Sequence, residues 1–415
     1  GVSALSSDTK GNRSTAIGRG ALNAQNFTTS TSVYNVAVGY LAGLSVTTGT
    51  NNTLIGGLSG DAITTGSNNT AVGYLSLTAN TTGVVNAAFG RETLASNTTG
   101  QSNTAFGTNA LYANTTASNN TAVGYQAGYN NTGTRLLALG YHASLNHTTG
   151  NYNTAVGYQS QRNNQIGESN TSLGENTLYY NTGSNNTALG RQALQDNTTA
   201  SNNTAVGYRS LKFNTTGTTN TAVGMQSLYV NTTGSYNTAL GNNSLRLNTT
   251  GNFNTALGMY ALDANTTAGY NTAVGYRALY NNTTGEQNIA IGYNTLISNT
   301  TAAAVVAVGN DAGQAHTTQY GSTYIGHVAG YNSTGQNVCI GYASGYTGNG
   351  PTSLRAGGGN TLIGTYTNAH DANCSEAVVI GHNGTTKGNN TSFLVPNSGA
   401  YQGNNQTTWA QTSDR

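Results

Sequence analysis

The chain has 415 residues, and only 6% of them are charged, against about 25% in ordinary soluble domains. Its net charge of +2 argues against nucleic acid or an anionic membrane as a partner, because a nearly neutral surface attracts neither. No run of roughly 18 apolar residues occurs, so we expect no membrane insertion, and the opening GVSALSSDTKGNRS lacks the apolar core of a signal peptide.

A short sequence recurs along most of the chain. It reads NTALGMYALDANTTAGYN from Asn254 and NTAVGYRALYNNTTGEQN from Asn271. Its glycine returns 22 times between Gly18 and Gly381, mostly in steps of 17 residues, and an apolar residue always precedes it. A disordered chain would not keep this phase, so the period indicates a solenoid built from stacked coils.

The composition of each repeat favours β-structure. We predict two short strands per repeat, the TAVG segment and the following Ala-Leu segment, joined by turns of Asn, Thr and Gly. The apolar spacing has no 3.6-residue period, which argues against helical repeats. In chain order we predict a regular shaft over residues 1–341, irregular coils with an insertion loop over 342–391, and a linker to a C-terminal chaperone domain over 392–415. The predicted fold is an all-β solenoid or β-roll of about 22 coils.

Stacked coils would place each residue over its equivalent in the next coil. We predict that the apolar residue before the glycine forms the repeat core: Val72, Val123, Val156, Val206, Val223, Leu240, Leu257 and Val274. We predict that the glycines form turns: Gly73, Gly124, Gly157, Gly207, Gly224, Gly241, Gly258 and Gly275. The Asn four residues before the glycine should form a ladder of side-chain amides: Asn69, Asn103, Asn120, Asn203, Asn237, Asn254 and Asn271. The Asn seven residues after the glycine should form a second ladder, as at Asn80 and Asn97.

Each coil contains few apolar residues, so a lone chain would have a thin core. Packing one face of every coil against identical chains would bury more apolar surface. We therefore predict a parallel homotrimer with its three-fold axis along a fibre. With a rise of roughly 4.8 Å per coil, the shaft would be on the order of 100 Å long.

The repeat resembles those of known fibrous proteins. The pattern NTAVGYxAL, with one aliphatic residue and one glycine per coil, is similar to the left-handed β-roll heads of trimeric autotransporter adhesins. Arrays of this pattern followed by NTTG also resemble phage tail fibres, those of cyanophages in particular, over about Asn12–Thr391. This resemblance implies a structural and adhesive fibre that belongs to a virion. The fibre would join the baseplate or other fibre proteins and would bind a receptor on the host surface, for which a glycan is one candidate. The alternative is a bacterial trimeric surface adhesin or extracellular filament at the cell surface.

The C-terminal segment GNNQTTWAQTSDR resembles the junction before the intramolecular chaperone of endosialidase-type tail spikes and fibres. In that family the chain cleaves itself between the Ser and Asp of this motif, which implies cleavage of the Ser413–Asp414 bond here. The family's chaperone begins SDxRLK, of which only Ser413, Asp414 and Arg415 are present. We therefore expect the gene to continue past Arg415.

Patterns typical of enzymes are missing from the sequence. The glycine-rich Gly348–Asn360 lacks the Lys-Ser/Thr of a phosphate loop. We find neither paired carboxylates nor a nucleophile with a base, and so predict no enzyme, no metal and no cofactor. The six histidines are scattered and expected at the surface, with metal binding on a trimer axis as the alternative. Cys339 replaces the repeat's alanine and should be a buried thiol.

Two further surface functions are compatible with parts of the repeat. Tyr after the glycine, as at Tyr125 and Tyr158, could form a sugar-stacking stripe, but Arg91 and Met225 share that position and favour a tolerant, partly exposed site. Asn-x-Thr sequons would suit a densely N-glycosylated protein, although the Asn ladders explain them without sugar. A receptor-binding tip, if one exists, is expected in the irregular coils Tyr342–Asn390.

Overall fold

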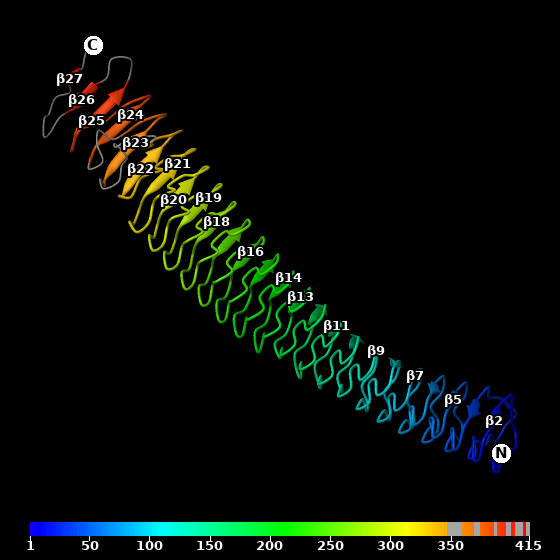
Figure 1. The fold of residues 1–415 in the computed structure, drawn as a ribbon. Coiled ribbons are helices and arrows are strands. Elements are labelled where there is room, and N and C mark those ends of the chain that lie inside the picture. The colour runs from blue at the N-terminus through cyan, green and yellow to red at the C-terminus, as the bar shows by residue number, and fades with distance from the viewer. Residues whose placement is uncertain (347–357, 369–373, 386–387, 396–399, 403–409, 412–415) are drawn as a thin grey trace. The chain divides into compact units, whose positions relative to one another are not determined.

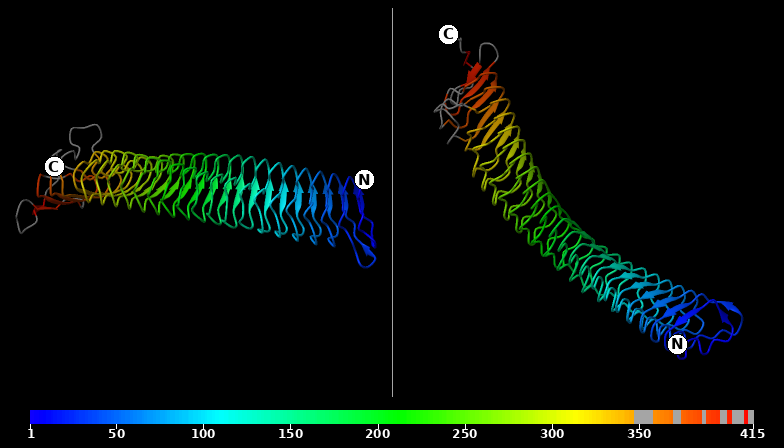
Figure 2. Two further views of the ribbon diagram at one scale, coloured as in Figure 1. Left: turned by 90° about the horizontal axis from the view of Figure 1, so that it is seen from below. Right: turned by 45° about the vertical axis from the view of Figure 1, so that its right-hand side comes forward.

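The computed structural model describes residues 1–346, 358–368, 374–385, 388–395, 400–402 and 410–411. Its described part is all-β, a parallel β-solenoid of about 21 turns with a period of about 17 residues. The chain divides into two units, Gly1–Ala205 and Val206–Arg415. Within each unit, strands from successive turns lie side by side (Figure 1, Figure 2). The described residues include no helix suited to crossing a lipid bilayer.

Unit 1 contains one parallel ladder formed by β2 and β4 to β13, and a separate parallel pair formed by β1 and β3. The strands are β1 (Gly11–Asn12), β2 (Thr15–Ile17), β3 (Thr31–Ser32), β4 (Val36–Val38), β5 (Thr53–Ile55), β6 (Thr70–Val72), β7 (Ala87–Phe89), β8 (Thr104–Phe106), β9 (Thr121–Val123), β10 (Leu137–Leu139), β11 (Thr154–Val156), β12 (Thr171–Leu173) and β13 (Thr187–Leu189). The next strand, β14 (Thr204–Val206), lies at the unit boundary.

Unit 2 continues with parallel pairing from β15 to β25 and ends with two antiparallel pairs, β25 with β26 and β26 with β27. The strands are β15 (Thr221–Val223), β16 (Thr238–Leu240), β17 (Thr255–Leu257), β18 (Thr272–Val274), β19 (Ile289–Ile291), β20 (Val306–Val308), β21 (Thr323–Ile325), β22 (Asn337–Ile340), β23 (Asn360–Ile363), β24 (Val378–Gly381), β25 (Ser392–Val395), β26 (Ala400–Gln402) and β27 (Ala410–Gln411).

The strands pair with equivalent residues opposite one another. In β8 and β9, for example, Thr104 pairs with Thr121 and Ala105 with Ala122. The same register holds where the repeat is longer, because Cys339 of β22 pairs with Leu362 of β23 across a 23-residue step. Residues 347–357 of the predicted insertion loop lie outside the described residues. The segment 392–415, predicted as a linker, contributes β25, β26 and β27.

The middle residue of each three-residue strand from β4 to β21, rather than the last, forms the core. In β15, Ala222 is fully buried, whereas Val223 is only half-buried. The prediction that the residue before the glycine lies inside the chain is therefore wrong. The reason is strand alternation: with Asn220 and Ala222 pointing inward, Thr221 and Val223 must point outward. The correction applies to the whole predicted set, whose members are exposed or half-buried: Val72, Val123, Val156, Val206, Val223, Leu240, Leu257 and Val274.

The segment after the glycine is a turn and does not form the predicted second strand. Ala110 and Leu111 are both fully buried, and a strand cannot direct two consecutive side chains to one face. The chain solves this with positive φ angles at Asn109 (59°) and Leu111 (50°). The amide of Asn109 donates to the carbonyl of Arg91 in the preceding turn, and that of Leu111 donates to Ala127 in the following one. Hydrogen bonds to the preceding and the following coil of the solenoid thus fix the conformation of this segment.

Where the repeat departs from its usual core residues, a larger side chain at one inward position is matched by a smaller one at its neighbours. The usual inward pair is Ala in the strand and Leu four residues after the glycine, as in Ala105 and Leu111. Leu54 replaces the strand alanine in β5. The Leu position then holds glycine both in the same repeat, at Gly60, and in the preceding repeat, at Gly43. A Cβ on Gly43 would lie 2.7 Å from Cδ1 of Leu54, and one on Gly60 would lie 2.8 Å from its Cδ2. Large and small residues therefore exchange places within one packed layer.

Candidate functional site

The outward-facing side of the strands is an exposed surface of regular composition in each unit. We call this surface the strand face; it consists of the first and last residue of each three-residue strand from β2 to β21. The first position is usually Thr, and the last is Val, Ile, Leu or Phe. The last residue is often well exposed, as at Ile17 (58%), Phe106 (58%) and Leu173 (49%) in unit 1 and Leu240 (46%) in unit 2.

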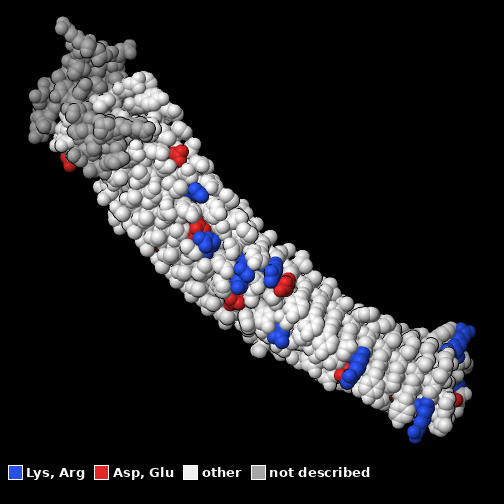
Figure 3. Space-filling view, in the orientation of Figure 1, with Lys and Arg blue, Asp and Glu red and all other residues white. Residues whose placement is uncertain are grey.

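Charged residues avoid the strand face. Neither outward position carries a charge in any strand from β2 to β24. The charges lie in the turns instead, as in the ion pair of Arg191 with Glu175. Figure 3 shows them scattered singly and in small groups over a largely uncharged surface. Such a surface can be buried against another apolar surface without the cost of dehydrating a charge.

The glycines predicted to form turns lie directly after the strands. All eight have φ between 126° and 141°: Gly73, Gly124, Gly157, Gly207, Gly224, Gly241, Gly258 and Gly275. A Cβ on Gly207 would lie 2.6 Å from the carbonyl oxygen of Gly224 in the next turn. Both the backbone conformation and the close stacking of turns therefore require glycine at this position.

The first Asn ladder lies inside the chain, four residues before the glycine. The side-chain Nδ2 of Asn103 donates to Oδ1 of Asn86 (3.2 Å) and to the carbonyl of Ala117 (3.0 Å), and its backbone amide donates to the same Oδ1 (3.0 Å). Every predicted member donates its backbone amide to the Asn of the preceding turn: Asn69, Asn103, Asn120, Asn203, Asn237, Asn254 and Asn271. These hydrogen bonds satisfy amides that would otherwise be costly to bury.

The second Asn ladder runs parallel to the first, seven residues after the glycine. Nδ2 of Asn114 donates to Oδ1 of Asn97 at 2.9 Å, and Asn97 donates to Asn80 at 2.9 Å. The two ladders are joined where Nδ2 of Asn120 lies 3.3 Å from Oδ1 of Asn114. The buried interior of each turn is thus a mixture of small apolar side chains and paired amides.

Two histidines occupy second-ladder positions, so they are not the surface residues that the sequence suggested. His147 is fully buried, and its Nδ1 lies 2.7 Å from Oδ1 of Asn131. His316 is also fully buried, and its Nδ1 lies 3.0 Å from the hydroxyl of Tyr324. Burial lowers the pKa of His147 to about 4 and also lowers the pKa of His316. Both histidines lie seven residues after a repeat glycine, His147 after Gly140 and His316 after Gly309. This spacing, which they share with the Asn of the second ladder, was the sequence signal for their burial.

Large or reactive side chains replace the strand alanine in unit 2. Tyr324 fills the space left by Gly313 and Gly330, and its hydroxyl donates to Ser333 Oγ (3.0 Å). Cys339 follows it in the next strand and is fully buried, as predicted, and burial raises the pKa of its thiol to about 12. A thiol that stays protonated and inaccessible is a packing group rather than a nucleophile.

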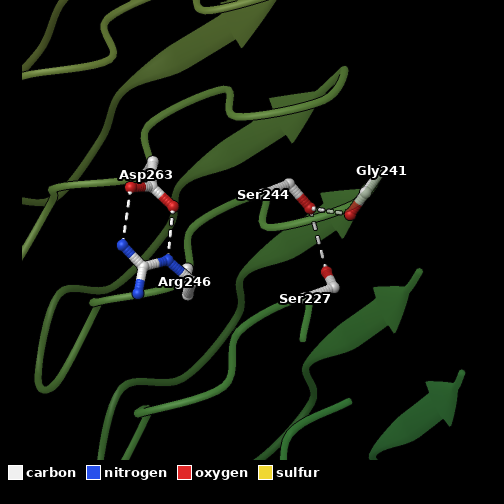
Figure 4. A network of polar contacts seen from close by, with 5 residues as sticks. All are labelled: Ser227, Gly241, Ser244, Arg246 and Asp263. Carbon is white, nitrogen blue, oxygen red and sulfur yellow. Dashed lines mark hydrogen bonds and ion pairs between the residues drawn. The ribbon is translucent and has the colours of Figure 1, made fainter. Parts of the chain in front are cut away.

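Further polar contacts join neighbouring turns (Figure 4). Arg246 and Asp263 occupy equivalent positions in successive turns, and Nε and a terminal guanidinium nitrogen of Arg246 lie 2.8 Å and 3.0 Å from the two carboxylate oxygens. The hydroxyls of Ser227 and Ser244, also in successive turns, lie 2.9 Å apart, and Ser244 donates to the carbonyl of Gly241. The Arg246–Asp263 and Ser227–Ser244 contacts link successive turns. The polar groups involved are paired within the chain.

Some of the exposed aromatic side chains form files whose members stack on one another. Tyr141 packs against Tyr125 (centroids 5.5 Å apart) and against Tyr158 (5.3 Å), nearly parallel to both. Phe253 is likewise stacked between Tyr236 and Tyr270. This second file was not identified from the sequence. Because both faces of a central ring are covered by its neighbours, only ring edges face solvent, which does not suit a sugar-stacking stripe.

A polar groove of about 480 Å³ is lined partly by the end of the predicted shaft, with Thr317, Gln319 and Gln336, and partly by the described irregular coils, with Glu376. No group of three or more His, Cys, Asp or Glu side chains suited to a metal occurs among the described residues. Ser413 and Asp414, the predicted cleavage junction, lie outside the residues that the structure describes.

Comparison with known proteins adds no relative: no family model, no curated protein and no solved structure matches the chain.

Proposed function

We propose that the chain is the shaft, or the distal part, of a structural and adhesive fibre, a phage tail fibre that attaches the virion to its host. The observation that carries this proposal is the in-register stacking of nearly identical turns. Each turn uses its interior to bind the next one, through the two Asn ladders and the strand ladder. A chain built in this way can hold a binding region at a distance from its anchor, which is the mechanical task of a fibre.

The fibre would work as a parallel homotrimer. Support comes from the thin core of each turn, whose inward side chains are mostly Ala, Leu and Asn, and from the exposed apolar residues on the strand face. Association would bury this surface and add the stabilisation that a short turn lacks. Its partners would be the baseplate or other fibre proteins at one end and a host-surface receptor at the other, and no catalysis is involved.

Two measurements test this function. Sedimentation equilibrium of the purified chain should give three times the mass of 42.5 kDa, and a folded monomer would contradict the trimer. Antibodies against the chain should label the tails of virions in immunogold electron microscopy. Labelling of bacterial envelopes instead would assign the chain to a trimeric surface adhesin and overturn the virion proposal while leaving the fibre.

A further inference from the structure

We propose that the strand face of unit 1, formed by the outward residues of β2 and β4 to β13, is the surface through which copies of this chain pack against each other. This inference rests on the proposed homotrimer and names the surface that the trimer would bury. It also reverses the sequence-based prediction, which placed the same side chains inside a single chain.

This surface carries a column of apolar side chains, several of which are exposed. The last strand residue is 58% exposed at Ile17, 38% at Ile55, 58% at Phe106, 38% at Val123 and 49% at Leu173. In-register pairing aligns these side chains in one column, so they form a continuous stripe rather than isolated residues. Monomeric proteins seldom expose a contiguous apolar patch of more than a few hundred Å².

Association through the strand face would cover side chains that a single chain leaves accessible. The apolar outward residues of unit 1 range from half-buried to 58% exposed. A parallel three-fold arrangement would divide this surface between two neighbouring copies. Apolar area removed from water in these contacts would stabilise the assembly in proportion to the number of strands involved.

A second copy of the chain fits this surface better than an unrelated protein. Each turn presents one Thr column and one aliphatic column, repeated with the spacing of the strands. An identical chain has the same spacing, so the columns stay matched through all the turns of the unit. The absence of charge from both columns of β2 and β4 to β13 also argues against a charged partner.

The other exposed files are less suited to this contact. Tyr125, Tyr141 and Tyr158 already cover each other's ring faces. The turn surfaces carry the charged residues, including Arg91 and Arg191 with side chains 64% and 54% exposed. Burying those surfaces would require dehydrating these charges.

The test uses two exposed apolar positions of unit 1 that differ in location. Phe106→Glu places a carboxylate on the strand face, and Ile166→Glu places one on a turn, where Ile166 is 60% exposed. In a parallel assembly, the carboxylates introduced at position 106 of neighbouring copies would meet in the contact. We expect Phe106→Glu to weaken association roughly 100-fold or more, so that sedimentation gives the mass of one chain, whereas Ile166→Glu and Phe106→Ile stay assembled.

A cysteine scan keeps the proposal testable if Phe106→Glu does not fold. The native thiols Cys339 and Cys374 are buried, so an introduced surface cysteine can be followed separately. Oxidation of Val123→Cys should link two chains through a disulfide, whereas Ile166→Cys should stay unlinked. Assembled wild type with no Val123→Cys cross-link, or with Ile166→Cys linked instead, would overturn the strand face as the contact and leave the proposed trimer standing. A monomeric wild type would overturn both.

Discussion

The Nδ1 atom of His147 lies 2.7 Å from Oδ1 of Asn131, so that a histidine takes part in the second Asn ladder in place of an amide. Because an amide oxygen can only accept, Nδ1 carries the proton, and Nε2 is free to accept from Nδ2 of Asn153 at 3.0 Å. Both hydrogen bonds therefore need the neutral ring. Burial reinforces this by lowering the pKa of His147 to about 4.

The first prediction concerns pH. The folded-state pKa of His147 lies below the value of about 6.5 for an exposed histidine, so its contribution to stability is complete above pH 6.5 and is lost as the pH falls toward 4. The total loss is about 3 kcal/mol. Between about pH 7.5 and about pH 5, opening of the turns around His147 should increase roughly 30-fold. Amide hydrogen exchange, corrected for intrinsic rates, measures this turn by turn.

His147→Asn supplies the control for this prediction. Asn is the residue that the neighbouring turns carry at this position, as at Asn131 and Asn164. The variant should keep the ladder and lose the pH dependence of opening at this turn. An equal response to acid in His147→Asn would show that another group is responsible.

Strand alternation explains why part of the interior was predictable from the sequence and part was predicted wrongly. Repetition alone placed Asn103 over Asn86 and Asn120, because stacked coils align equivalent residues. It did not say which face points inward. An inward Asn four residues before the glycine forces the Ala two before it inward and the aliphatic residue outward. The predictions for Asn120, directly before β9, and for Val123, at its end, were therefore incompatible.

The turn after the strand could not be read from local preferences. Leu111 has a φ of 50°, a conformation that costs an L-residue about 1–2 kcal/mol in isolation. Its amide is held by the carbonyl of Ala127 in the next turn, and its side chain is fully buried. Contacts between turns therefore override the preference of a single turn. The exchange of Leu54 with Gly43 is different, because both residues were visible in the sequence as departures at fixed positions of the repeat.

The second prediction distinguishes the two faces of a strand. Ala222→Asp would place a carboxylate in the fully buried interior of unit 2, where it lacks donors, and should unfold the affected turns at a cost of several kcal/mol. Val223→Asp points outward and should leave the turns of a single chain folded. Circular dichroism and limited proteolysis of both variants, compared in dilute solution, measure the difference. Equal unfolding by the two substitutions would contradict the assignment of the faces.

The third prediction concerns the volume exchange around Leu54. Leu54→Ala leaves a cavity and should cost about 2–5 kcal/mol. Gly43→Leu alone should also destabilise, because a side chain there would overlap Leu54. The double variant restores the usual Ala and Leu of the repeat, and Gly43 already has a φ of 61°, close to the 50° that Leu22 adopts. We expect the double variant to be more stable than either single variant in thermal unfolding. If its loss of stability equals the sum of the two single losses, the two side chains do not occupy the same space in the core.

The fourth prediction tests the first Asn ladder. Asn103→Ala removes the acceptor of the Asn120 backbone amide and the donor to the carbonyl of Ala117, both of which are buried. Each unpaired group costs about 1–3 kcal/mol, so the variant should lose about 3 kcal/mol or more. Thr116→Ala, at an exposed position of a nearby turn, serves as the control and should stay within about 0.5 kcal/mol of wild type.

Asn103→Asp separates hydrogen bonding from packing in the same ladder, because the side chain keeps its shape. The acceptor for Asn120 survives, but the group facing the carbonyl of Ala117 becomes an oxygen that cannot donate when ionised. Burial, together with repulsion between the new carboxylate oxygen and the carbonyl oxygen of Ala117, should raise the pKa of the new carboxyl group above its usual value. The variant should therefore be least stable near neutral pH and recover as the pH falls through that raised pKa, since the protonated group can donate to Ala117. Thermal unfolding as a function of pH checks this, and the absence of recovery in acid would mean that the Ala117 hydrogen bond contributes little to the ladder.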